Sequence, residues 1–219
     1  MASSAALVSL SLAQPLVEAV ATVAFALSGL IEAARKRLDA VGVVVVAGLA
    51  AFGGGTLRDI LLDRRPFFWV QHATWLWALL ALCVAAMLFM RARHFALTER
   101  AMQWPDAVGL GLFCAGGTQI ALAAQMPALV AVLMGVVTAV FGGVLRDIVC
   151  NEVPRAFSDH RPYALCAFAG GWLTVGLASA GMAGEVALFG GAALAFALRL
   201  AALLADYRLP TWQHGRPED

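Results

Sequence analysis

The sequence predicts an all-α polytopic membrane protein with seven transmembrane helices, and three observations support this fold class. The chain is 62% hydrophobic and only 13% charged, whereas soluble domains carry about 25% charged residues. Its apolar residues form seven long blocks without the alternation of polar and apolar positions that membrane β-strands show. A pattern of three such blocks also recurs 88 positions further along the chain.

Each block is close to the roughly 20 residues that an α-helix needs to cross a bilayer. The blocks cover residues 15–31, 41–62, 74–90, 107–124, 128–150, 163–180 and 185–205. We therefore expect residues 1–205 to form a single transmembrane domain and residues 206–219 to form a cytoplasmic tail. Glycines interrupt the second and fifth blocks, so these two helices are expected to be kinked.

Basic residues are distributed unequally between the two predicted sides of the membrane. Those that follow or end the first, third, fifth and seventh blocks are Arg35, Lys36, Arg37, Arg91, Arg93, Arg100, Arg155, Arg161, Arg199, Arg208 and Arg216. The other side receives only Arg64 and Arg65. Because cytoplasmic loops carry the excess of Lys and Arg, we expect the N-terminus outside and the C-terminus in the cytoplasm.

An internal repeat links the two halves of the chain. Gly54, Gly55, Leu57, Arg58, Asp59 and Ile60 align with Gly142, Gly143, Leu145, Arg146, Asp147 and Ile148, and Pro66 aligns with Pro154. The match predicts one unit over about 14–92, a second over about 102–180, and a seventh helix over about 184–205. Three helices are an odd number, so the second unit must be inverted, and such repeats are typical of transport sites.

The repeated glycines are the first candidate site. Gly53, Gly54 and Gly55 in one half, and Gly142 and Gly143 in the other, weaken their helices, because glycine costs about 1 kcal/mol relative to alanine. Backbone groups freed there would have to line a wet cavity or be buried in protein. The alternative is that glycine only lets two helices approach closely. Thr56 and Thr138 are candidate pore-lining residues, and hydrogen bonding between helices is an equal alternative.

The intramembrane charges are the second candidate site. Arg58-Asp59 and Arg146-Asp147 lie between apolar residues, where an unpaired charge costs at least about 2.5 kcal/mol. Neighbouring helical residues point about 100° apart, so we expect pairing across the repeats, Arg58 with Asp147 and Arg146 with Asp59. The arginines would either line a polar path or brace the broken helices. Glu18 and Asp106 are possible vestibule residues, acids favoured in a first helical turn by the helix dipole, or partners of the arginines.

Composition excludes several other classes of function. The net charge is +1, without the basic patch of a nucleic-acid-binding protein. The four cysteines are dispersed and the four histidines fall in loops or the tail, so neither a metal site nor a cofactor is predicted. The sequence contains no nucleophile–base pair or phosphate-binding motif, and we do not expect an enzyme.

The doubled motif is similar to that of a known family. Phe52-Gly53-Gly54-Gly55-Thr56-Leu57-Arg58-Asp59 and Phe141-Gly142-Gly143-Val144-Leu145-Arg146-Asp147, each followed by a proline, resemble the bacterial branch of the trimeric intracellular cation (TRIC) channel family. The resemblance covers almost the whole chain. It implies a homotrimer in the bacterial inner membrane, with one pore per protomer between the two kinked helices. The pores would conduct monovalent cations, potassium or sodium and chiefly potassium, within the surrounding lipids.

Two other functions are compatible with the pattern. Inverted repeats with broken helices are common in secondary transporters, so transport of a small solute such as an amino acid is the alternative. A membrane scaffold in which the glycines serve only packing is the third hypothesis.

Overall fold

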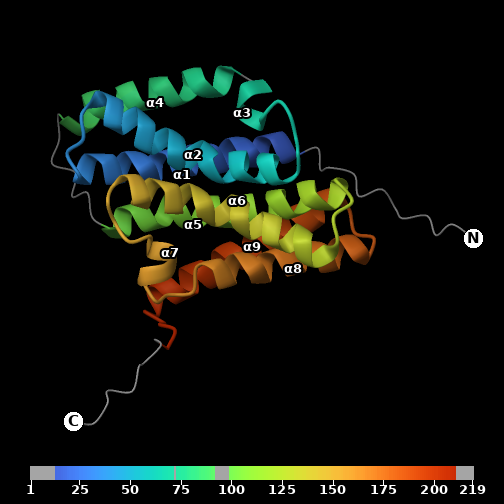
Figure 1. Cartoon of the computed structure of the whole chain (residues 1–219). Coiled ribbons are helices and arrows are strands. Elements are labelled where there is room, and N and C mark those ends of the chain that lie inside the picture. The colour runs from blue at the N-terminus through green and yellow to red at the C-terminus, as the bar shows by residue number, and fades with distance from the viewer. Residues whose placement is uncertain (1–12, 72, 92–98, 211–219) are drawn as a thin grey trace, which may run out of the picture.

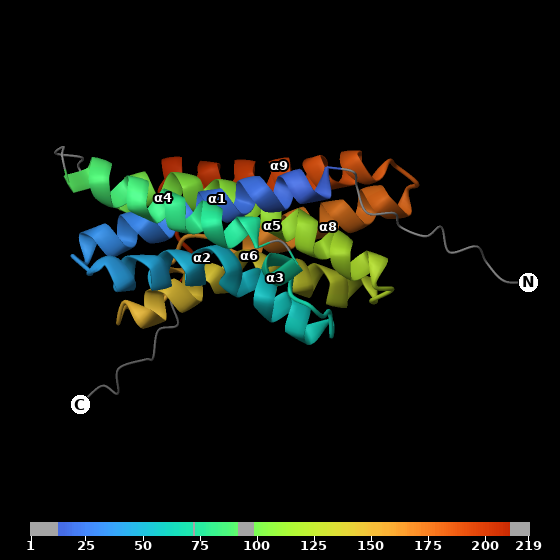
Figure 2. The ribbon, with the colours of Figure 1, turned by 90° about the horizontal axis from the view of Figure 1, so that it is seen from above.

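The computed structural model describes residues 13–71, 73–91 and 99–210, which form a bundle of helices along one common axis (Figure 1, Figure 2). The described elements are α1 (Gln14–Arg35), α2 (Ala40–Leu61), α3 (Phe68–Gln71), α4 (Thr74–Arg91), α5 (Glu99–Ala123), α6 (Ala128–Val149), α7 (Arg155–Ser158), α8 (Ala164–Ser179) and α9 (Gly184–Leu204). Within these ranges no strand occurs. Both termini, Arg93 and Arg216 lie outside the described residues.

Seven of these elements are long helices, and they lie close to the predicted blocks. The main difference is α5, which begins at Glu99 and includes Pro105 inside the helix, although the apolar block begins only at residue 107. Hydrophobicity marks the buried part of a helix, whereas polar turns at the end of a bundle keep helical hydrogen bonds without an apolar signal. The helix therefore extends further than its apolar residues indicate.

Five of the seven long helices meet the length and the hydrophobicity that a membrane span requires. α1, α2, α5 from Ala101, α6 and α9 are long and apolar enough to cross a membrane, whereas the apolar parts of α4 and α8 are shorter. Large apolar side chains such as Val41, Trp77, Phe89 and Leu204 are exposed on the outside of the bundle. Such a surface suits lipid rather than water. A total of seven spans stays a prediction.

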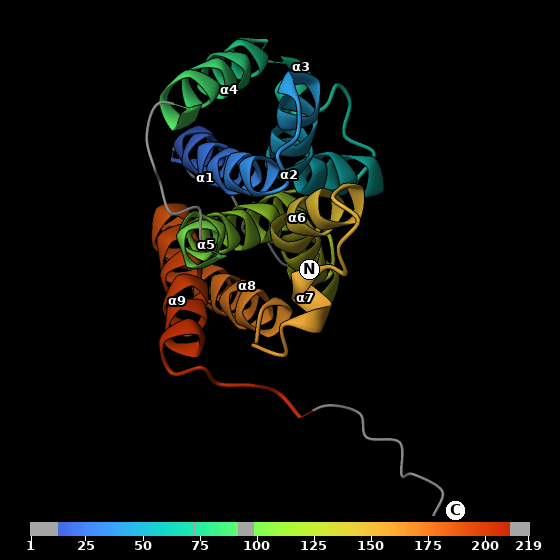
Figure 3. The same ribbon diagram turned by 90° about the vertical axis from the view of Figure 1, so that its left-hand side faces the viewer.

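The end-on view shows how the helices are layered (Figure 3). α5 and α6 lie in the middle, where α5 packs against α1, α6, α8 and α9. α1 and α2 lie on one side, with α4 outside them, and α8 and α9 lie on the other side. The central pair thus connects the first and second halves of the chain.

Corresponding helices of the two halves run in opposite directions (Figure 1). α2 and α6 each have 22 residues and begin 88 positions apart, at Ala40 and Ala128. The ends of α1, α6 and α9 lie at one end of the bundle together with α7, which we call the α7 end. The end of α2 and the short α3 lie at the other, the α3 end. Several basic residues of the predicted cytoplasmic loops, including Arg35, Lys36 and Arg155, therefore share the α7 end.

Candidate functional site

α2 and α6 cross at their glycines. A Cβ atom added to Gly54 would lie 2.0 Å from the Thr138 carbonyl oxygen, and one added to Gly142 would lie 2.3 Å from the Ala50 carbonyl oxygen. These contacts are equivalent under the 88-residue offset, since Ala50 corresponds to Thr138 and Gly54 to Gly142. The crossing is therefore symmetric, and only glycine permits such a close approach of two backbones.

Neither helix is interrupted at this crossing. α2 runs from Ala40 to Leu61 and α6 from Ala128 to Val149 in continuous helical structure. The prediction that the glycines break the helices and free backbone groups is therefore wrong. Lost backbone hydrogen bonds cost several kcal/mol in an apolar environment, more than a glycine costs inside an intact helix. A bend that keeps these hydrogen bonds stays a prediction.

The other glycines of the motifs have different neighbours. Added Cβ atoms at Gly53 and Gly55 would lie 2.7 Å from Leu145 and 2.4 Å from the Phe68 ring. At Gly143 the nearest atom, Nη2 of Arg146, would be at 3.5 Å. Gly143 thus borders the second charge cluster, whereas Gly53 and Gly55 serve packing.

The hydroxyl groups of the two candidate threonines form hydrogen bonds with other groups of the protein. Thr56 Oγ1 donates to the Phe52 carbonyl at 2.8 Å and accepts from the indole N–H of Trp69 at 2.9 Å. Thr138 is fully buried, and its hydroxyl donates to the Met134 carbonyl at 2.6 Å. In this conformation neither hydroxyl needs water as a partner.

The first charge cluster comprises Glu18, Arg58 and Asp59. Arg58 donates to Asp59 Oδ1 from Nε at 2.9 Å and from Nη2 at 2.8 Å, and its Nη1 donates to Glu18 Oε1 at 3.2 Å. Arg58 and Asp59 are each only 1% exposed. The second oxygen of Asp59 accepts the backbone N–H of Phe68 at 2.9 Å. The cluster thus joins α1, α2 and the start of α3.

The second charge cluster comprises Asp106, Arg146 and Asp147. Arg146 donates from Nε to Asp147 Oδ1 at 2.8 Å and from Nη1 to Asp106 Oδ1 at 3.1 Å. The second oxygen of Asp147 accepts the backbone N–H of Arg155 at 3.0 Å. This arrangement repeats the first cluster and joins α5, α6 and the start of α7.

Two further side chains complete the second cluster. The Tyr163 hydroxyl donates to Asp106 Oδ2 at 2.6 Å, and the Ser28 hydroxyl lies within hydrogen-bond distance of both Arg146 and Asp106. Tyr163 and Ser28 were not predicted, because neither position is matched by the same residue type in the other half. Their equivalents at the 88-residue offset are Trp75 and Gly116.

The predicted pairing across the repeats is wrong. Arg58 pairs with Asp59 and Arg146 with Asp147, and each arginine also reaches the acid 40 positions before it in the same half. The flexible arginine side chain folds back toward its neighbour, which the angle between adjacent Cβ atoms does not reveal. Glu18 and Asp106 therefore serve as partners of the buried arginines.

Arg58 and Arg146 lie in the last turns of α2 and α6, after the glycines, and these two helices end at opposite ends of the bundle (Figure 1). Asp106, Gly143, Arg146, Asp147 and Arg155 border a pocket of about 20 Å³. That volume holds about one water molecule. The space beside the second cluster is therefore small in this conformation.

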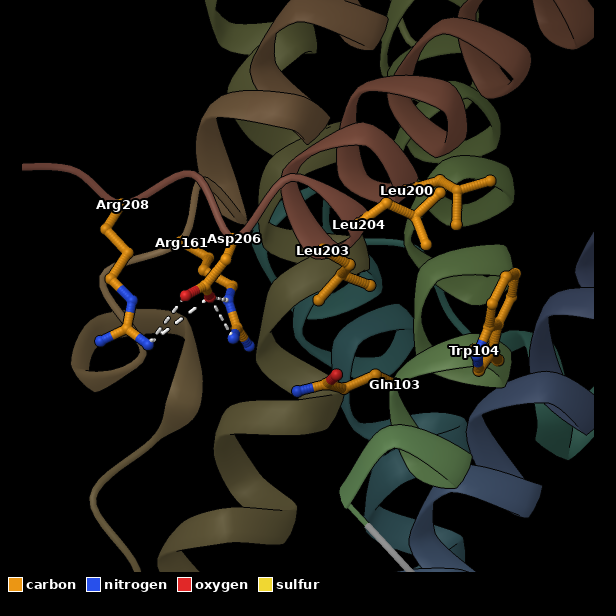
Figure 4. A pocket seen from close by; sticks show the side chains of 8 residues that line it. All are labelled: Gln103, Trp104, Arg161, Leu200, Leu203, Leu204, Asp206 and Arg208. Atoms are coloured by element: carbon orange, nitrogen blue, oxygen red, sulfur yellow. Dashed lines mark hydrogen bonds and ion pairs between the residues drawn. The ribbon is translucent and has the colours of Figure 1, made fainter.

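Two of the larger pockets at the α7 end are bordered by charged residues. One of about 390 Å³ is bordered by Arg35, Lys36, Gln103, Glu152 and Arg155. The hydrogen bond between Lys36 and Glu152 raises the pKa of the Lys36 ammonium and lowers the pKa of the Glu152 carboxyl. The other, of about 630 Å³, has Leu200, Leu203 and Leu204 on one side, while Arg161 and Arg208 turn toward Asp206 (Figure 4). Both of these pockets are thus bordered by charged side chains.

Tyr163→Phe is expected to destabilise the fold by about 1–3 kcal/mol, because Asp106 loses a buried hydrogen-bond donor. The sequence contains two tyrosines, and Tyr207 is exposed. Tyr207→Phe is therefore the matched control and should change stability by less than about 0.5 kcal/mol. Thermal unfolding of both variants in detergent tests this, and equal melting temperatures would contradict it.

Long apolar helices with an apolar outer surface and buried ionic clusters define a multi-pass integral membrane protein. A model of the family described as Glycine transporter matches residues 15–92 and 103–179. The chain belongs to this family, and it is a bacterial member of the TRIC family.

Individual relatives agree with this assignment. A UPF0126 membrane protein of Vibrio cholerae is 35% identical over 90% of this chain and 82% of its own length. The UPF0126 inner membrane protein YadS of Escherichia coli K12 is 33% identical over 88% of this chain and 93% of its own length.

Solved structures share the fold. The TRIC trimeric intracellular cation channel orthologue from Rhodobacter sphaeroides is 34% identical with a TM-score of 0.83, covering 90% of this chain and 100% of the other. A second structure, reported for conductance through TRIC cation channels, is 29% identical with a TM-score of 0.82, covering 92% and 98%.

Proposed function

We propose that this chain is a monovalent cation channel that conducts chiefly potassium. It would act in the bacterial inner membrane as a homotrimer, with one pore per protomer between α2 and α6. The proposal rests on the solved relatives that are described as cation channels and on the charge of the two buried clusters.

The balance of charge in each cluster is the observation that carries the proposal. Glu18 and Asp59 surround one arginine, Arg58, and Asp106 and Asp147 surround one arginine, Arg146. With all groups ionised, two carboxylates and one buried guanidinium give each cluster a net charge of −1, and the partly exposed Arg64, 3.7 Å from Asp59 Oδ1, offsets this charge at the first cluster. The buried arginines are therefore more than neutralised, and a cation approaching the second cluster is attracted.

The proposed topology is a 3+3 inverted repeat with a seventh helix and seven spans. The opposite directions of corresponding helices (Figure 1) and the two matches of one family model, over 15–92 and 103–179, support it. The basic residues of the α7 end favour a cytoplasmic C-terminus and an outside N-terminus. In an inverted pair, equivalent charge clusters would lie near the two ends of one path. The positions of Arg58 and Arg146 in the last turns of α2 and α6 support this arrangement.

Opening would have to widen the path between α2 and α6. At the symmetric contacts of Gly54 with Thr138 and of Gly142 with Ala50, the backbones of α2 and α6 approach too closely to admit a Cβ atom. Separation of these helices would expose the backbone and hydroxyl oxygens of the crossing, and oxygen ligands suit potassium. The glycines would then form the contact at which α2 and α6 separate when the channel opens.

Planar-bilayer recording of the purified protein tests the proposal. We expect unitary potassium currents, with a reversal potential that follows the cation gradient when potassium chloride is asymmetric. The absence of unitary current at every voltage, in a preparation that unfolds cooperatively, would overturn the channel function.

Amino-acid transport is the second candidate, and the description of the family as Glycine transporter favours it. A guanidinium beside carboxylates also complements a zwitterion. However, the pocket at the second cluster is about 20 Å³, whereas small-molecule sites are about 300 Å³ or larger. Uptake of labelled glycine into proteoliposomes distinguishes the candidates, because saturable, ion-coupled uptake without unitary currents would favour the transporter.

A further inference from the structure

Arg155 stands between two cavities at the α7 end. It borders the outer pocket of about 390 Å³ and also the inner pocket of about 20 Å³ beside Asp106 and Asp147. Gln103 and Arg155 border both pockets, and Arg155 is the charged residue at this shared boundary.

The interactions that hold Arg155 in this position include two with carboxylates and one with a thioether sulfur. Its Nη2 donates to Glu32 Oε2 at 3.0 Å, its backbone N–H donates to Asp147 Oδ2 at 3.0 Å, and its Nη1 lies 3.0 Å from Met102 Sδ. Glu32 is 1% exposed and also accepts from Arg35 at 2.8 Å. The buried carboxylate therefore fixes the arginine side chain at the boundary of the two pockets.

An exposed ion pair also connects the end of α1 with the segment before α7. Lys36 follows α1 and donates to Glu152, which lies in the turn before α7. Ser28, Glu32 and Lys36 are spaced four residues apart, so they lie along one face of α1. This face contacts Arg146, Arg155 and Glu152 of the second half in turn.

At the α3 end Arg64 pairs with Asp59 of the first cluster at 3.7 Å, but no described residue there repeats the pairing of Arg155 with a buried carboxylate outside the cluster. At the 88-residue offset Glu32 corresponds to Ile120, Lys36 to Ala124, and Arg155 to Phe67. The repeat therefore accounts for the two charge clusters but not for Arg155 and its carboxylate partner. A feature present at only one end of a repeated structure calls for a function specific to that end.

We propose that Arg155 is the gate of the α7 end. Held by Glu32, its guanidinium repels cations and fills the boundary between the two pockets. When Arg155 moves away, the pockets join and cations reach a cluster whose net charge is −1. This inference rests on the proposed channel function and adds to it the residue that controls entry from one side.

The test compares Arg155→Ala with wild type in planar bilayers. Arg35 still pairs with Glu32 in this variant, so we expect the fold to be retained. At 0.1 M potassium chloride we expect potassium current per channel, or open probability, to rise by about threefold or more, because one repelling charge is removed. The rise should be smaller at 1 M, where the Debye length falls from about 10 Å to about 3 Å. If Arg155→Ala does not assemble, Arg155→Gln, which keeps a polar side chain of similar length, replaces it.

Arg161→Ala is the matched control. Arg161 lies at the same end and carries the same charge, but it borders the pocket of about 630 Å³ and its side chain turns toward Asp206 (Figure 4). Its replacement should leave the current unchanged. An increase as large as that of Arg155→Ala would mean that charge at this end acts without a gate, and would overturn the proposal.

A second measurement separates a gate from a structural role. Arg155→Cys in a Cys150→Ser background offers one accessible thiol, because Cys83, Cys114 and Cys166 are buried. A cationic methanethiosulfonate reagent should restore the low wild-type current, and a neutral reagent of similar size should not. Equal effects of both reagents, or no change in current on replacing Arg155, would overturn the gate while the channel function stands. No current in any variant or in wild type would instead overturn the channel function itself.

Discussion

Arg146→Ala is expected to destabilise the protein by about 3–5 kcal/mol, because breaking a buried ion pair from one side costs about this much. Arg146 bonds to two carboxylates, those of Asp106 and Asp147, which are only 5% and 2% exposed. Removing the guanidinium leaves both buried acids without their cation. Thermal unfolding in detergent and the yield of assembled protein measure the loss.

Two comparisons isolate the cause. Arg161→Ala removes an arginine whose partner Asp206 is exposed, so it should cost no more than about 1 kcal/mol. Arg146→Met combined with Asp106→Asn and Asp147→Asn removes all three charges together, and should recover part of the stability that Arg146→Ala loses. If Arg146→Ala unfolds at the same temperature as Arg161→Ala, the cluster contributes no stability.

Gly54→Ala is expected to force α2 and α6 apart. The added methyl would lie 2.0 Å from the Thr138 carbonyl oxygen, about 1 Å closer than real Cβ atoms approach. Both groups belong to helix backbones, so no side chain can turn away. Overpacking costs about 3 kcal/mol at such a site, and the higher helix propensity of alanine offsets about 1 kcal/mol, which leaves a net loss of about 2 kcal/mol. Unitary current should change as well, because the crossing would no longer close.

Glycine positions elsewhere supply the control for this prediction. Gly176 lies in α8, and an added Cβ atom would meet no atom within 4 Å. Gly176→Ala should therefore stabilise the protein by about 0.5–1 kcal/mol. By the symmetry of the crossing, Gly142→Ala should resemble Gly54→Ala in its effect on stability. A Gly54→Ala protein as stable as the Gly176→Ala protein would show that the two helices do not need to approach this closely.

The repeat made much of the candidate site predictable. The offset of 88 positions identified Arg58, Asp59, Arg146 and Asp147, and it also aligned Glu18 with Asp106. The structure brings these residues together in two clusters of the same geometry. A repeat selects such residues because equivalent positions in equivalent helices have equivalent neighbours.

Residues without a counterpart in the other half escaped this signal. Ser28, Glu32, Arg155 and Tyr163 contact the second cluster or lie beside it, and Gly116, Ile120, Phe67 and Trp75 occupy the corresponding positions. Their contacts depend on how α1 and α8 lie against α5 and α6, and a one-dimensional pattern does not contain that information.

The sequence by itself determined the class of protein, the approximate helices, the two halves and the charged positions. These properties follow from the length of apolar blocks, from periodicity and from the alignment of the chain with itself, all of which are local or one-dimensional. Only the tertiary structure decided that the glycines bring intact helices together instead of breaking them. It also decided that each arginine pairs within its own half. Both outcomes depend on the distance and register between helices, because a glycine or an arginine acts through neighbours that packing supplies.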